Sequence, residues 1–499
     1  MVKIYNLHEA TGVAWWILKN YPQAELYIVG GAVRDFFAFG KYPEEIDFVT
    51  SLRPDELLKI FPYSDLVGKS FGVVKAGVTR GPGIPFVDVA TFRKDVYSAH
   101  DLHTKGAESV EFANSLEEDL SRRDFTFNAM ALKVTDHNKM VNFEFTESDL
   151  IDPYGGLNHA KNGIIRFVGK SLERIKEDPC RLLRACRFAG MWQKYADNTG
   201  GGFIEHNSLR AMQESAARVQ LVAKERIHDE LIKTMYTVNP ALAIVKMAEI
   251  GILHYFMYPM AVCQGVMQNS HHLDDVFTHC ILAMNAVDIK YPLIRMAALL
   301  HDVAKPVVKE MGTDGEHHFY QHEYLGSVIS REILTNLKFS NDEINYICEL
   351  VFNHMFHVDD LPDDYVEEGI YTETYIRTRT VKRIMSRCRV PIRDVLRLRM
   401  ADRRGNRAKR GVPRHFKEVL RTIRKIEKEN QALHVRDLKI NGKDLIDMGL
   451  KPGPQFKVIL DACLEHVLHE PKLNYAEHLR TFVECHFIKK GQEGSAGSM

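Results

Sequence analysis

Residues 26–35 have the sequence LYIVGGAVRD, and this stretch decides the architecture of the first part of the chain. Its first four residues are apolar and favour a short buried strand, and two glycines then break the pattern. A helix is expected to begin near Arg34. Because glycine has no Cβ, Gly30 and Gly31 let the backbone approach a ligand closely, and the free N–H groups at the start of the next helix suit a phosphate.

Three carboxylates follow in apolar surroundings. Glu45 and Asp47 accompany a strand expected over residues 46–50, and both acids are expected on one face because side-chain direction along a strand repeats every two residues. Asp88 lies within another apolar stretch, residues 86–92. Buried acids without partners are costly, so acids in apolar strands favour a functional site. The three acids together predict a site for two Mg²⁺ ions, one activating a hydroxyl and one stabilising a leaving pyrophosphate.

The pattern of the sequence changes after about residue 150. Strand and helix patterns are mixed before that point, which predicts an α+β fold whose head has a mixed sheet with helices. From about residue 170 the apolar spacing is helical almost everywhere, so we expect an all-helical remainder. The expected divisions are a head at 1–160, a helical neck at 161–260, a middle domain at 261–410, a helical C-terminal region at 411–490 and a disordered tail at 491–499.

The composition is that of a globular protein. The 66 Lys and Arg residues balance the 66 Asp and Glu residues, so a nucleic-acid partner would have to meet a local basic surface. The eight cysteines form no CxxC pair, which is typical of reduced thiols and argues against a disulfide framework or a zinc ribbon. No apolar run reaches the roughly 20 residues of a membrane helix, and the first residues lack a signal-peptide pattern. We expect a cytoplasmic protein without membrane contact, and the oligomeric state stays undetermined.

A row of basic residues marks the start of the helical part. Residues 177–188 have the sequence EDPCRLLRACRF, which places Asp178, Arg181, Arg184 and Arg187 at three-residue intervals. On a helix this spacing puts side chains along one side. A basic helix face is usually only a solvated surface, but here an acid opens the row.

Histidines and acids are spread over expected helices in the middle domain. A single His–Asp pair is common at a helix end, but four histidines with acids beside them are better explained by metal ligation. The candidate ligands are His279, His301, Asp302, His322, His354 and Asp402. A basic segment, residues 403–428, follows them and is the expected contact with RNA phosphates.

The motifs of the head and neck resemble class II tRNA nucleotidyltransferases, the family of CCA-adding enzymes and bacterial poly(A) polymerases. The resemblance rests on residues 30–35 (GGAVRD), 45–47 (EID), 122–130 (RRDFTFNAM), 151–157 and 177–188. It implies a polymerase-β-type nucleotidyltransferase head that adds nucleotides from CTP and ATP to the 3′ end of tRNA. The family carries Asp where this chain has Glu45, and glutamate can also ligate Mg²⁺.

The resemblance also implies roles for single residues. The implied catalytic acids are Glu45, Asp47 and Asp88, of which Glu45 and Asp47 would hold Mg²⁺. The implied nucleotide contacts are Gly30, Gly31, Arg34, Arg123, Asp124, Asp178, Arg181, Arg184 and Arg187. Asp178 and Arg181 would read the base edge, since arginine offers a rigid fork of donors and aspartate offers acceptors. The segment around Arg226 resembles the helix that supports this site.

The histidine-rich stretch resembles the HD phosphohydrolase superfamily. The resemblance implies one metal held by His279, His301, Asp302 and Asp402, with His322 and His354 available for a second. The metal would be Ni²⁺, Mn²⁺, Co²⁺ or Mg²⁺ and would activate a water for attack on a phosphoester. Phosphatase and 2′,3′-cyclic phosphodiesterase activities are implied.

Three functions stay open at this point. The expected one is a CCA-adding enzyme, which adds CMP, CMP and AMP. The second is a poly(A) polymerase or an enzyme adding only CC or only A; residues 68–74 (GKSFGVV) look like the tRNA enzymes' strand, and residues 94–108 are about long enough for the flexible loop that CC-adding relatives lack. The third is a metal phosphohydrolase whose head only binds tRNA.

Overall fold

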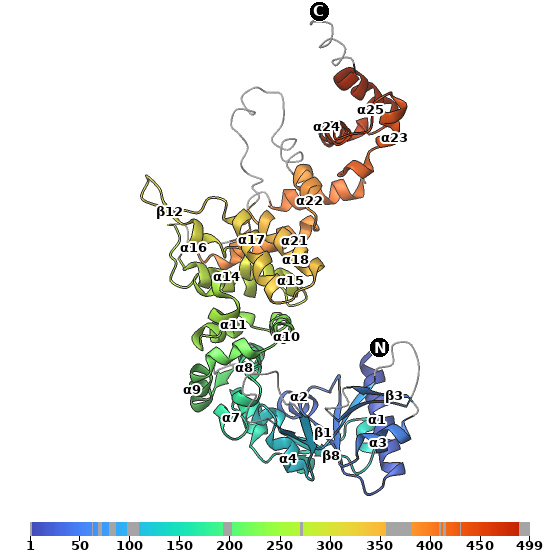
Figure 1. Cartoon of the computed structure of the whole chain (residues 1–499), viewed down its shortest axis with the longest axis vertical. Coiled ribbons are helices and arrows are strands. Elements are labelled where there is room, and N and C mark those ends of the chain that lie inside the picture. The colour runs from blue at the N-terminus through green and yellow to red at the C-terminus, as the bar shows by residue number, and fades with distance from the viewer. Residues whose placement is uncertain are drawn as a thin grey trace, which may run out of the picture.

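The computed structural model is elongated, with the head at one end, the C-terminal helices at the other and the remaining helices between them (Figure 1). It describes residues 2–61, 63–67, 72–78, 86–96, 109–192, 202–269, 273–355, 381–408, 411–412, 416–429 and 431–488. The expectations for residues 68–71, for most of the loop at 94–108 and for the tail at 491–499 lie outside the described residues.

A mixed seven-stranded sheet forms the head and confirms the expected α+β fold class. The strand order is β3-β4-β5-β2-β1-β8-β9. The strands are β1 (Leu26–Val29), β2 (Asp47–Thr50), β3 (Tyr63–Val67), β4 (Val73–Gly77), β5 (Val87–Thr91), β8 (Ala131–Lys133) and β9 (Leu150–Ile151), with a separate hairpin of β6 (Arg93–Val96) and β7 (Ser109–Phe112). β2 and β5 pair in parallel, whereas β1 pairs antiparallel with β2 and with β8.

Helices cover this sheet and explain why β1, an inner strand, is apolar throughout. They are α1 (Val2–Asn20), α2 (Gly31–Phe39), α3 (Pro54–Ile60), α4 (Leu116–Ser121), α5 (Asn138–Val141) and α6 (Gly156–Lys161). Leu26 and Ile28 of β1 join the core that contains Val13 of α1, whereas Tyr27 and Val29 join a second core. A strand buried on both faces has a continuous apolar run, which is the pattern of residues 26–29.

The remainder of the chain is mostly helical, as expected. The neck contains α7 (Ser171–Glu177), α8 (Arg181–Trp192), α9 (His206–Glu214), α10 (Lys224–Met235), α11 (Pro240–Glu249), α12 (Leu253–Phe256) and α13 (Tyr258–Ala261). The middle part contains α14 (Val276–Asn285), α15 (Pro292–Leu300), α16 (Lys305–Val308), α17 (His322–Asn336), α18 (Asn341–Asn353) and α21 (Ile392–Gly405). The C-terminal part contains α22 (Phe416–Lys428), α23 (Gly442–Asp447), α24 (Gln455–His469) and α25 (Ala476–Val483).

Two short sheets correct the expectation of an all-helical remainder. The first pairs β10 (Ile164–Ile165) with β11 (Phe203–Ile204), and the second pairs β12 (Glu310–Met311) with β13 (His317–His318). Each strand has only two residues, which is too short for an alternating pattern to be recognised in the sequence. The second pair is a hairpin, and the positive φ of 78° at Gly315 allows its turn.

Aromatic rings fasten the head to the neck. Phe125 and Phe127 follow α4 in the head but belong to the hydrophobic core of the neck and middle helices. The ring of Phe127 lies 4.4 Å from that of Trp192, which ends α8. This contact holds the segment between α4 and β8 against the helices of the neck. Within the described residues, none of the helices combines the length and the apolar character needed to cross a bilayer.

Candidate functional sites

Strand pairing places two acids of the head side by side. β2 and β5 run parallel with Phe48 opposite Val89, so the residues before them, Asp47 and Asp88, are opposite each other at the same end of the strands. Burial raises the pKa of Asp47 and the neighbouring Asp88 raises it further, whereas Arg123 lowers it. A divalent cation would relieve the repulsion between the two carboxylates, so the pair fits a Mg²⁺ site.

Glu45 does not share this strand, so the expectation of two acids on one strand face was wrong. β2 begins at Asp47, and Glu45 lies in a bend before it with an exposed side chain. The strand begins there because Asp47 pairs with Val29, the last residue of β1, and the chain turns at Gly30 with a φ of 74°. Glu45 still raises the pKa of Asp47, although it does not line the cleft described below.

The glycine turn begins its helix earlier than expected. α2 starts at Gly31 rather than near Arg34, because the positive φ of Gly30 turns the chain directly into the helix. A Cβ at Gly30 would lie 3.5 Å from Nη1 of Arg123, an ordinary van der Waals contact, so the positive φ and not a lack of space favours glycine at this turn. Arg123 is held there by the buried Asp119, whose Oδ2 accepts from its Nη2 at 3.0 Å.

A buried carboxylate connects the glycine turn to the neck. Arg184 of α8 donates through Nε and Nη2 to Oδ2 of Asp124, at 2.8 and 2.5 Å. Asn128 donates to the other oxygen of Asp124 at 3.0 Å and accepts from Nη1 of Arg34 at 2.8 Å. Burial raises the pKa of Asp124, but Arg184 and Asn128 outweigh it and bring the pKa to about 2. The carboxylate is therefore charged and ties the two parts together.

The row from Asp178 to Arg187 does not lie along one helix, contrary to the sequence prediction. α7 ends at Glu177 and Asp178 caps it, since the proline that follows Asp178 cannot continue the helix. Arg181 opens α8 and is buried. Its Nη1 donates to the carbonyl of Arg174 and to Oε2 of Glu177, both at 2.8 Å, and its Nη2 donates to the carbonyl of Arg122 at 2.7 Å. Arg181 therefore connects neck and head in this structure.

α10 contributes two residues that the sequence analysis did not single out as site residues. Arg226 donates through both Nη atoms to the two oxygens of Asp178, at 2.9 and 2.8 Å. One helical turn later, Oε2 of Glu230 accepts from Nε of Arg187 at 2.7 Å, and its Oε1 lies 3.9 Å from Nη1 of Arg184. The sequence signal for them is weak: they are opposite charges at i and i+4, but α10 also carries Lys224, Glu225, Asp229 and Lys233.

Many of these side chains line one cleft of about 450 Å³ between the sheet and the neck. Its charged lining consists of Asp47, Asp88, Arg93, Arg122, Arg123, Asp124, Asp178, Arg181, Arg184 and Arg226. Acids that can hold a cation and arginines that can bind phosphates or a base edge therefore line the same space. Its volume is in the range of pockets for small ligands and cofactors.

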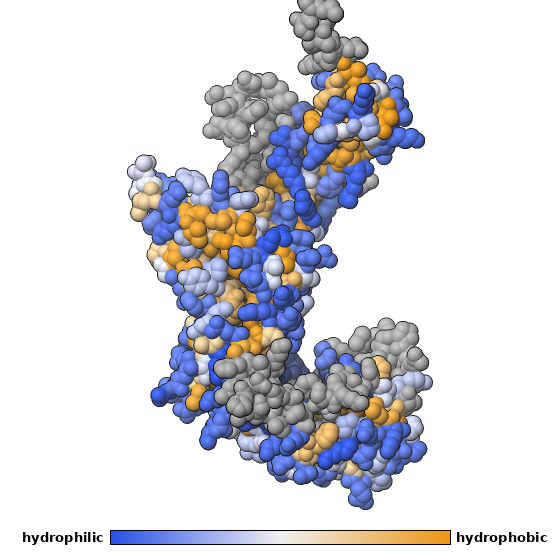
Figure 2. Space-filling model, in the orientation of Figure 1, coloured by the Kyte–Doolittle hydropathy of each residue, from blue (hydrophilic) through white to orange (hydrophobic). Residues whose placement is uncertain are grey.

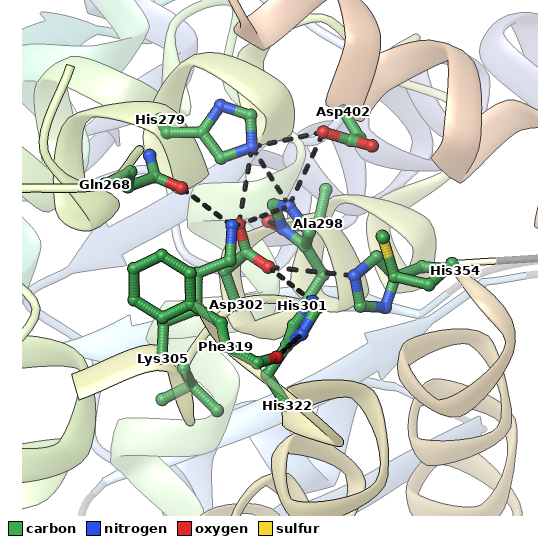
Figure 3. A network of polar contacts seen from close by, with 12 residues as sticks. Gln268, His279, Ala298, His301, Asp302, Lys305, Phe319, His322, His354 and Asp402 are labelled. Atoms are coloured by element: carbon green, nitrogen blue, oxygen red, sulfur yellow. Dashed lines mark hydrogen bonds and ion pairs between the residues drawn. The ribbon is translucent and has the colours of Figure 1, made fainter. Parts of the chain in front are cut away.

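A second cluster of chemical groups is buried in the middle helices, with Asp302 at its centre (Figure 3). Oδ2 of Asp302 lies 3.5 Å from Nε2 of His279 and 3.3 Å from Nε2 of His301. Oδ1 lies 3.4 Å from Nε2 of His322 and 3.7 Å from Nε2 of His354. Three sets have ligand atoms within 4.8 Å of one another: His279, His301 and Asp402; Asp302, His322 and His354; and Cys280, His301 and Asp302.

The histidines are oriented in the way that metal ligands require. In three of them Nδ1 donates to the backbone carbonyl three residues earlier: His301 to Ala298, His322 to Phe319 and His354 to Val351, at 2.8, 2.7 and 2.6 Å. This contact fixes the tautomer and leaves the Nε2 lone pair available. Nε2 of His322 and Nε2 of His354 are buried and make no hydrogen bond, so the donor set fits a metal ion.

Lys305 and Gln268 complete this centre and were not predicted. Nζ of Lys305 lies 2.6 Å from Oδ2 of Asp302 and donates to Oε1 of Gln268 at 2.7 Å. Burial raises the pKa of Asp302, but His301 and Lys305 outweigh it and hold the pKa well below its usual range. Both acids of the centre stay ionised, since the hydrogen bond from His279 likewise outweighs burial and lowers the pKa of Asp402.

Four protein-family models match successive parts of the chain. The Poly A polymerase head domain matches residues 26–166, and a family described as an RNA and SrmB-binding site of polymerase A matches residues 203–262. The HD domain matches residues 271–404, and tRNA nucleotidyltransferase domain 2 matches residues 414–483.

Individual relatives agree with these matches. The chain is 29% identical to the A-adding tRNA nucleotidyltransferase of Deinococcus radiodurans over 71% of this chain and 76% of that protein. It is 35% identical to the CCA-adding enzyme of Geobacillus thermodenitrificans over 46% of this chain, a match that spans 50% of that enzyme. The fold resembles the Bacillus stearothermophilus CCA-adding enzyme in complex with CTP, with a TM-score of 0.64 and 22% identity over 98% of this chain and 99% of that one.

Proposed function

The chain belongs to the tRNA nucleotidyltransferase and poly(A) polymerase family, and on this basis we propose that it adds CMP, CMP and AMP in turn to the 3′ end of tRNA. The observation that carries the proposal is the single cleft in which the opposed acids Asp47 and Asp88 of the head meet the Asp178–Arg226 pair of the neck. One side of the cleft has the chemistry for phosphates, and the other side has the chemistry for a base.

The transfer itself requires charge stabilisation more than covalent help from the protein. The tRNA 3′-oxygen forms a bond to the α-phosphorus, the bond from this phosphorus to the β-phosphate oxygen breaks, and pyrophosphate leaves while the hydroxyl proton is released. Mg²⁺ held by Asp47 and Asp88, with Glu45 as the third acid, would supply charge stabilisation at the phosphates. The backbone beside Gly31 and the guanidinium of Arg123 bind the triphosphate from the protein side.

Selection of the nucleotide falls to the neck. Cytosine and adenine each present an amino donor on the Watson–Crick edge, and Asp178 is placed to accept from it. Arg226 fixes the plane of this carboxylate through its two hydrogen bonds. Arg184 is held by Asp124 and Arg187 by Glu230. Both lie on α8, and we expect them near the base or the triphosphate, with Arg184 in the cleft lining. The tRNA body would lie along the exposed basic side chains of α22.

A-only addition is the second candidate. Two observations favour it: the relative that covers 71% of this chain is an A-adding enzyme, and the CCA-adding relative matches only 46% of it. The distinction concerns which nucleotides are accepted, not which residues perform the transfer. Both candidates therefore use the same cleft and the same acids.

The transferase proposal is tested on tRNAs that end before CCA, after C and after CC. The purified protein, Mg²⁺ and labelled CTP or ATP are supplied separately and together, and products are read at single-nucleotide resolution. Addition of C, C and A followed by a stop supports the CCA-adding enzyme, and addition of A only to the tRNA ending in CC supports the second candidate. A long ladder of A, or no incorporation that depends on Asp47, contradicts both.

We propose phosphoester hydrolysis as a second activity, at the His/Asp centre. A water oxygen forms a bond to phosphorus, the bond to the ester oxygen breaks, and a proton passes to the leaving oxygen. Ni²⁺, Mn²⁺, Co²⁺ or Mg²⁺, bound by the histidines and acids around Asp302, would activate this water. Lys305, whose ammonium pairs with Asp302, would contribute positive charge near the phosphate.

The two sites are tested against each other. Asp47→Ala is expected to abolish nucleotide incorporation and to leave phosphoester hydrolysis unchanged, whereas His301→Ala is expected to do the opposite. Metal content of the purified protein gives a second measure. His301→Ala removes one of the proposed metal ligands of the His/Asp centre, whereas Asp47→Ala leaves that centre intact. Loss of both activities in either variant, with the fold intact by circular dichroism, would contradict two independent sites.

A further inference from the structure

Arg295 is a buried cation at the junction between the neck and the middle helices. It lies in α15 and is 4% exposed. Burial lowers the pKa of Arg295, and the attraction of Asp288 offsets this only in part. Within the described residues Arg295 forms no ion pair. Because a cation is costly to bury unless hydrogen bonds replace its water, the contacts that hold it there are informative.

The guanidinium of Arg295 donates to three backbone carbonyls. Its Nη1 donates to the carbonyls of Met235 and Thr237, at 2.6 and 2.7 Å, and its Nε donates to that of Val287 at 2.9 Å. Met235 is the last residue of α10. The last carbonyls of a helix have no partner within the helix and carry the negative end of its dipole, so a cation stabilises them. Arg295 therefore fixes the end of α10 to the middle helices.

The segment that Arg295 holds, residues 235–239, also supports α8. The backbone N–H of Asn239 donates to the carbonyl of Gly190 in α8 at 3.0 Å. A Cβ at Gly190 would lie 2.6 Å from the carbonyl oxygen of Asn239 and 3.0 Å from Oγ1 of Thr237. The two backbones therefore meet without a side chain between them. Both helices that carry the charged residues of the neck, α8 and α10, are held at this one segment.

A chain of hydrogen bonds runs from this segment toward the cleft. Oγ1 of Thr237 donates to the carbonyl of Thr234 at 2.7 Å, and Oγ1 of Thr234 donates to that of Glu230, also at 2.7 Å. These three residues are buried. Oε2 of Glu230 accepts from Nε of Arg187 at 2.7 Å. One helical turn before Glu230 lies Arg226, which orients the carboxylate proposed to read the base.

Apolar packing alone would hold these helices together without fixing their rotation, because it has no direction. The neck and middle helices share one hydrophobic core that contains Met235 and Leu299, and their surface is continuous on the face that Figure 2 shows. Hydrogen bonds have preferred distances and angles. The three bonds of Arg295 therefore supply the direction that the shared core lacks.

We propose that Arg295 is a positioning residue for nucleotide selection, through which the middle helices control the alignment of Arg226 with Asp178. The proposal rests on the nucleotide transfer proposed above and adds what controls the selectivity of that site. Arg295 itself touches no substrate. A small shift of α10 would move the guanidinium of Arg226 relative to the carboxylate that it orients, and a base edge would then be read with less discrimination.

The test measures selection as a ratio of kcat/KM values. The full chain receives labelled CTP or UTP with a tRNA that ends before CCA, and ATP or GTP with a tRNA that ends in CC. Cytosine and adenine present an amino group where uracil and guanine present a carbonyl oxygen, so each pair differs at the group that Asp178 would read. A variant that is only less folded loses both rates of a pair equally, so its ratio stays unchanged.

Arg295→Lys keeps the charge, but one nitrogen replaces the two that donate here. We expect it to lower the ratio roughly 2- to 5-fold, and no more than Arg226→Lys does, because the effect passes through α10. The double variant should therefore lose no more than Arg226→Lys alone. Thr234→Val interrupts the chain of hydrogen bonds nearer the cleft and should lower the ratio even where Arg295→Lys does not fold.

Lys382→Met is the matched control. Nζ of Lys382 donates to the carbonyl of Leu468, in the last turn of α24, at 3.2 Å, and Lys382 is 5% exposed. This is the same kind of contact, a buried cation at a helix end, but at the junction with the C-terminal helices. Lys382→Met should lower the temperature of thermal unfolding and leave the selection ratio at its wild-type value.

Binding separates this proposal from the transfer itself. Calorimetry gives the Kd of CTP and of UTP, each with Mg²⁺, for the wild type and for Arg295→Lys. A smaller difference between the two nucleotides in Arg295→Lys supports the positioning role even where nothing is incorporated, a result that counts only against the proposed transfer.

Three results would overturn the positioning role. The first is a selection ratio that keeps its wild-type value in both Arg295→Lys and Thr234→Val. The second is a pair of losses that multiply in the double variant, which would show that Arg295 acts apart from Arg226. The third is an equal loss of selection in Lys382→Met, which would make the effect a general loosening of the chain.

Discussion

Replacing Asp124 by asparagine should loosen the head from the neck, and the structure gives the size of the effect. Asp124 is 8% exposed and holds Arg184 of the neck through two hydrogen bonds. Lowering its pKa from 3.8 to about 2 corresponds to roughly 2.5 kcal/mol of stability at neutral pH. Breaking a buried pair can cost about 3–5 kcal/mol, but Arg184 is 31% exposed and remains near Glu230, so we expect about 2–3 kcal/mol.

The dependence on pH has a definite sign. Because the folded protein lowers the pKa of Asp124, the carboxylate stabilises the fold fully above pH 3.8, and this stabilisation is lost as the pH falls toward 2. The difference in unfolding free energy between wild type and Asp124→Asn should therefore be constant from pH 7 to about pH 5 and shrink below pH 4. A difference that grows on acidification would contradict the assignment.

Tryptophan fluorescence can follow this junction directly. Trp192 lies at the contact between neck and head, and replacing Trp15 and Trp16 by phenylalanine leaves it as the only reporter among the three tryptophans. Urea unfolding then gives the loss of unfolding free energy in each variant. The matched control is Asp149→Asn, because Asp149 also has a pKa of about 2 but owes it to an exposed contact with Lys139 that water screens. Equal losses of unfolding free energy in Asp124→Asn and Asp149→Asn would show that burial does not strengthen the contact of Asp124.

Three further substitutions test separate parts of the structure. Arg226→Lys keeps the charge beside Asp178 but loses the paired hydrogen bonds, so incorporation of wrong nucleotides should rise about fivefold. The surface change Arg210→Lys should have no effect. Single-nucleotide incorporation assays measure both variants. Asp302→Ala should abolish phosphoester hydrolysis and retained metal without changing CTP incorporation, as assays of each activity and metal analysis would show. Gly156→Ala places a Cβ against a backbone oxygen of the head and should cost about 1–3 kcal/mol or more in thermal unfolding, unlike Gly453→Ala, which has open space around it.

Local patterns were sufficient to predict the head. The apolar run at residues 26–29 is a strand because both of its faces are buried, and the glycines end it because Gly30 takes a positive φ. Asp47 and Asp88 each stand out as acids beside apolar residues, and strand pairing brings them together. A parallel pair cannot be recognised from either strand alone, so the sequence predicted the acids but not their register.

Partners that are distant in sequence account for most of what was not predicted. Arg226 binds Asp178 across 48 residues, and Arg184 binds Asp124 across 60. Spacing within a helix carries no information about such contacts. The row that begins at Asp178 was expected along one helix because its three-residue interval continues across a proline, but the proline divides it between a cap and a new helix. In the structure Arg181 therefore lies in the contact between neck and head and not on a solvated helix face.

The position of Glu45 outside the strand bears on the glutamate that stands where the family resemblance implies an aspartate. A carboxylate on a paired strand has its Cα fixed by two neighbours, so one extra methylene moves the charge by about a bond length, a shift to which catalytic geometry is sensitive. Asp47 is in this situation, because it pairs with Val29 on one side and lies opposite Asp88 on the other. Glu45 lies in an exposed bend, where a small backbone adjustment can offset the longer side chain. A longer side chain at position 45 is therefore easier to accommodate than one at position 47, where the same change would displace a carboxylate that strand pairing holds in place.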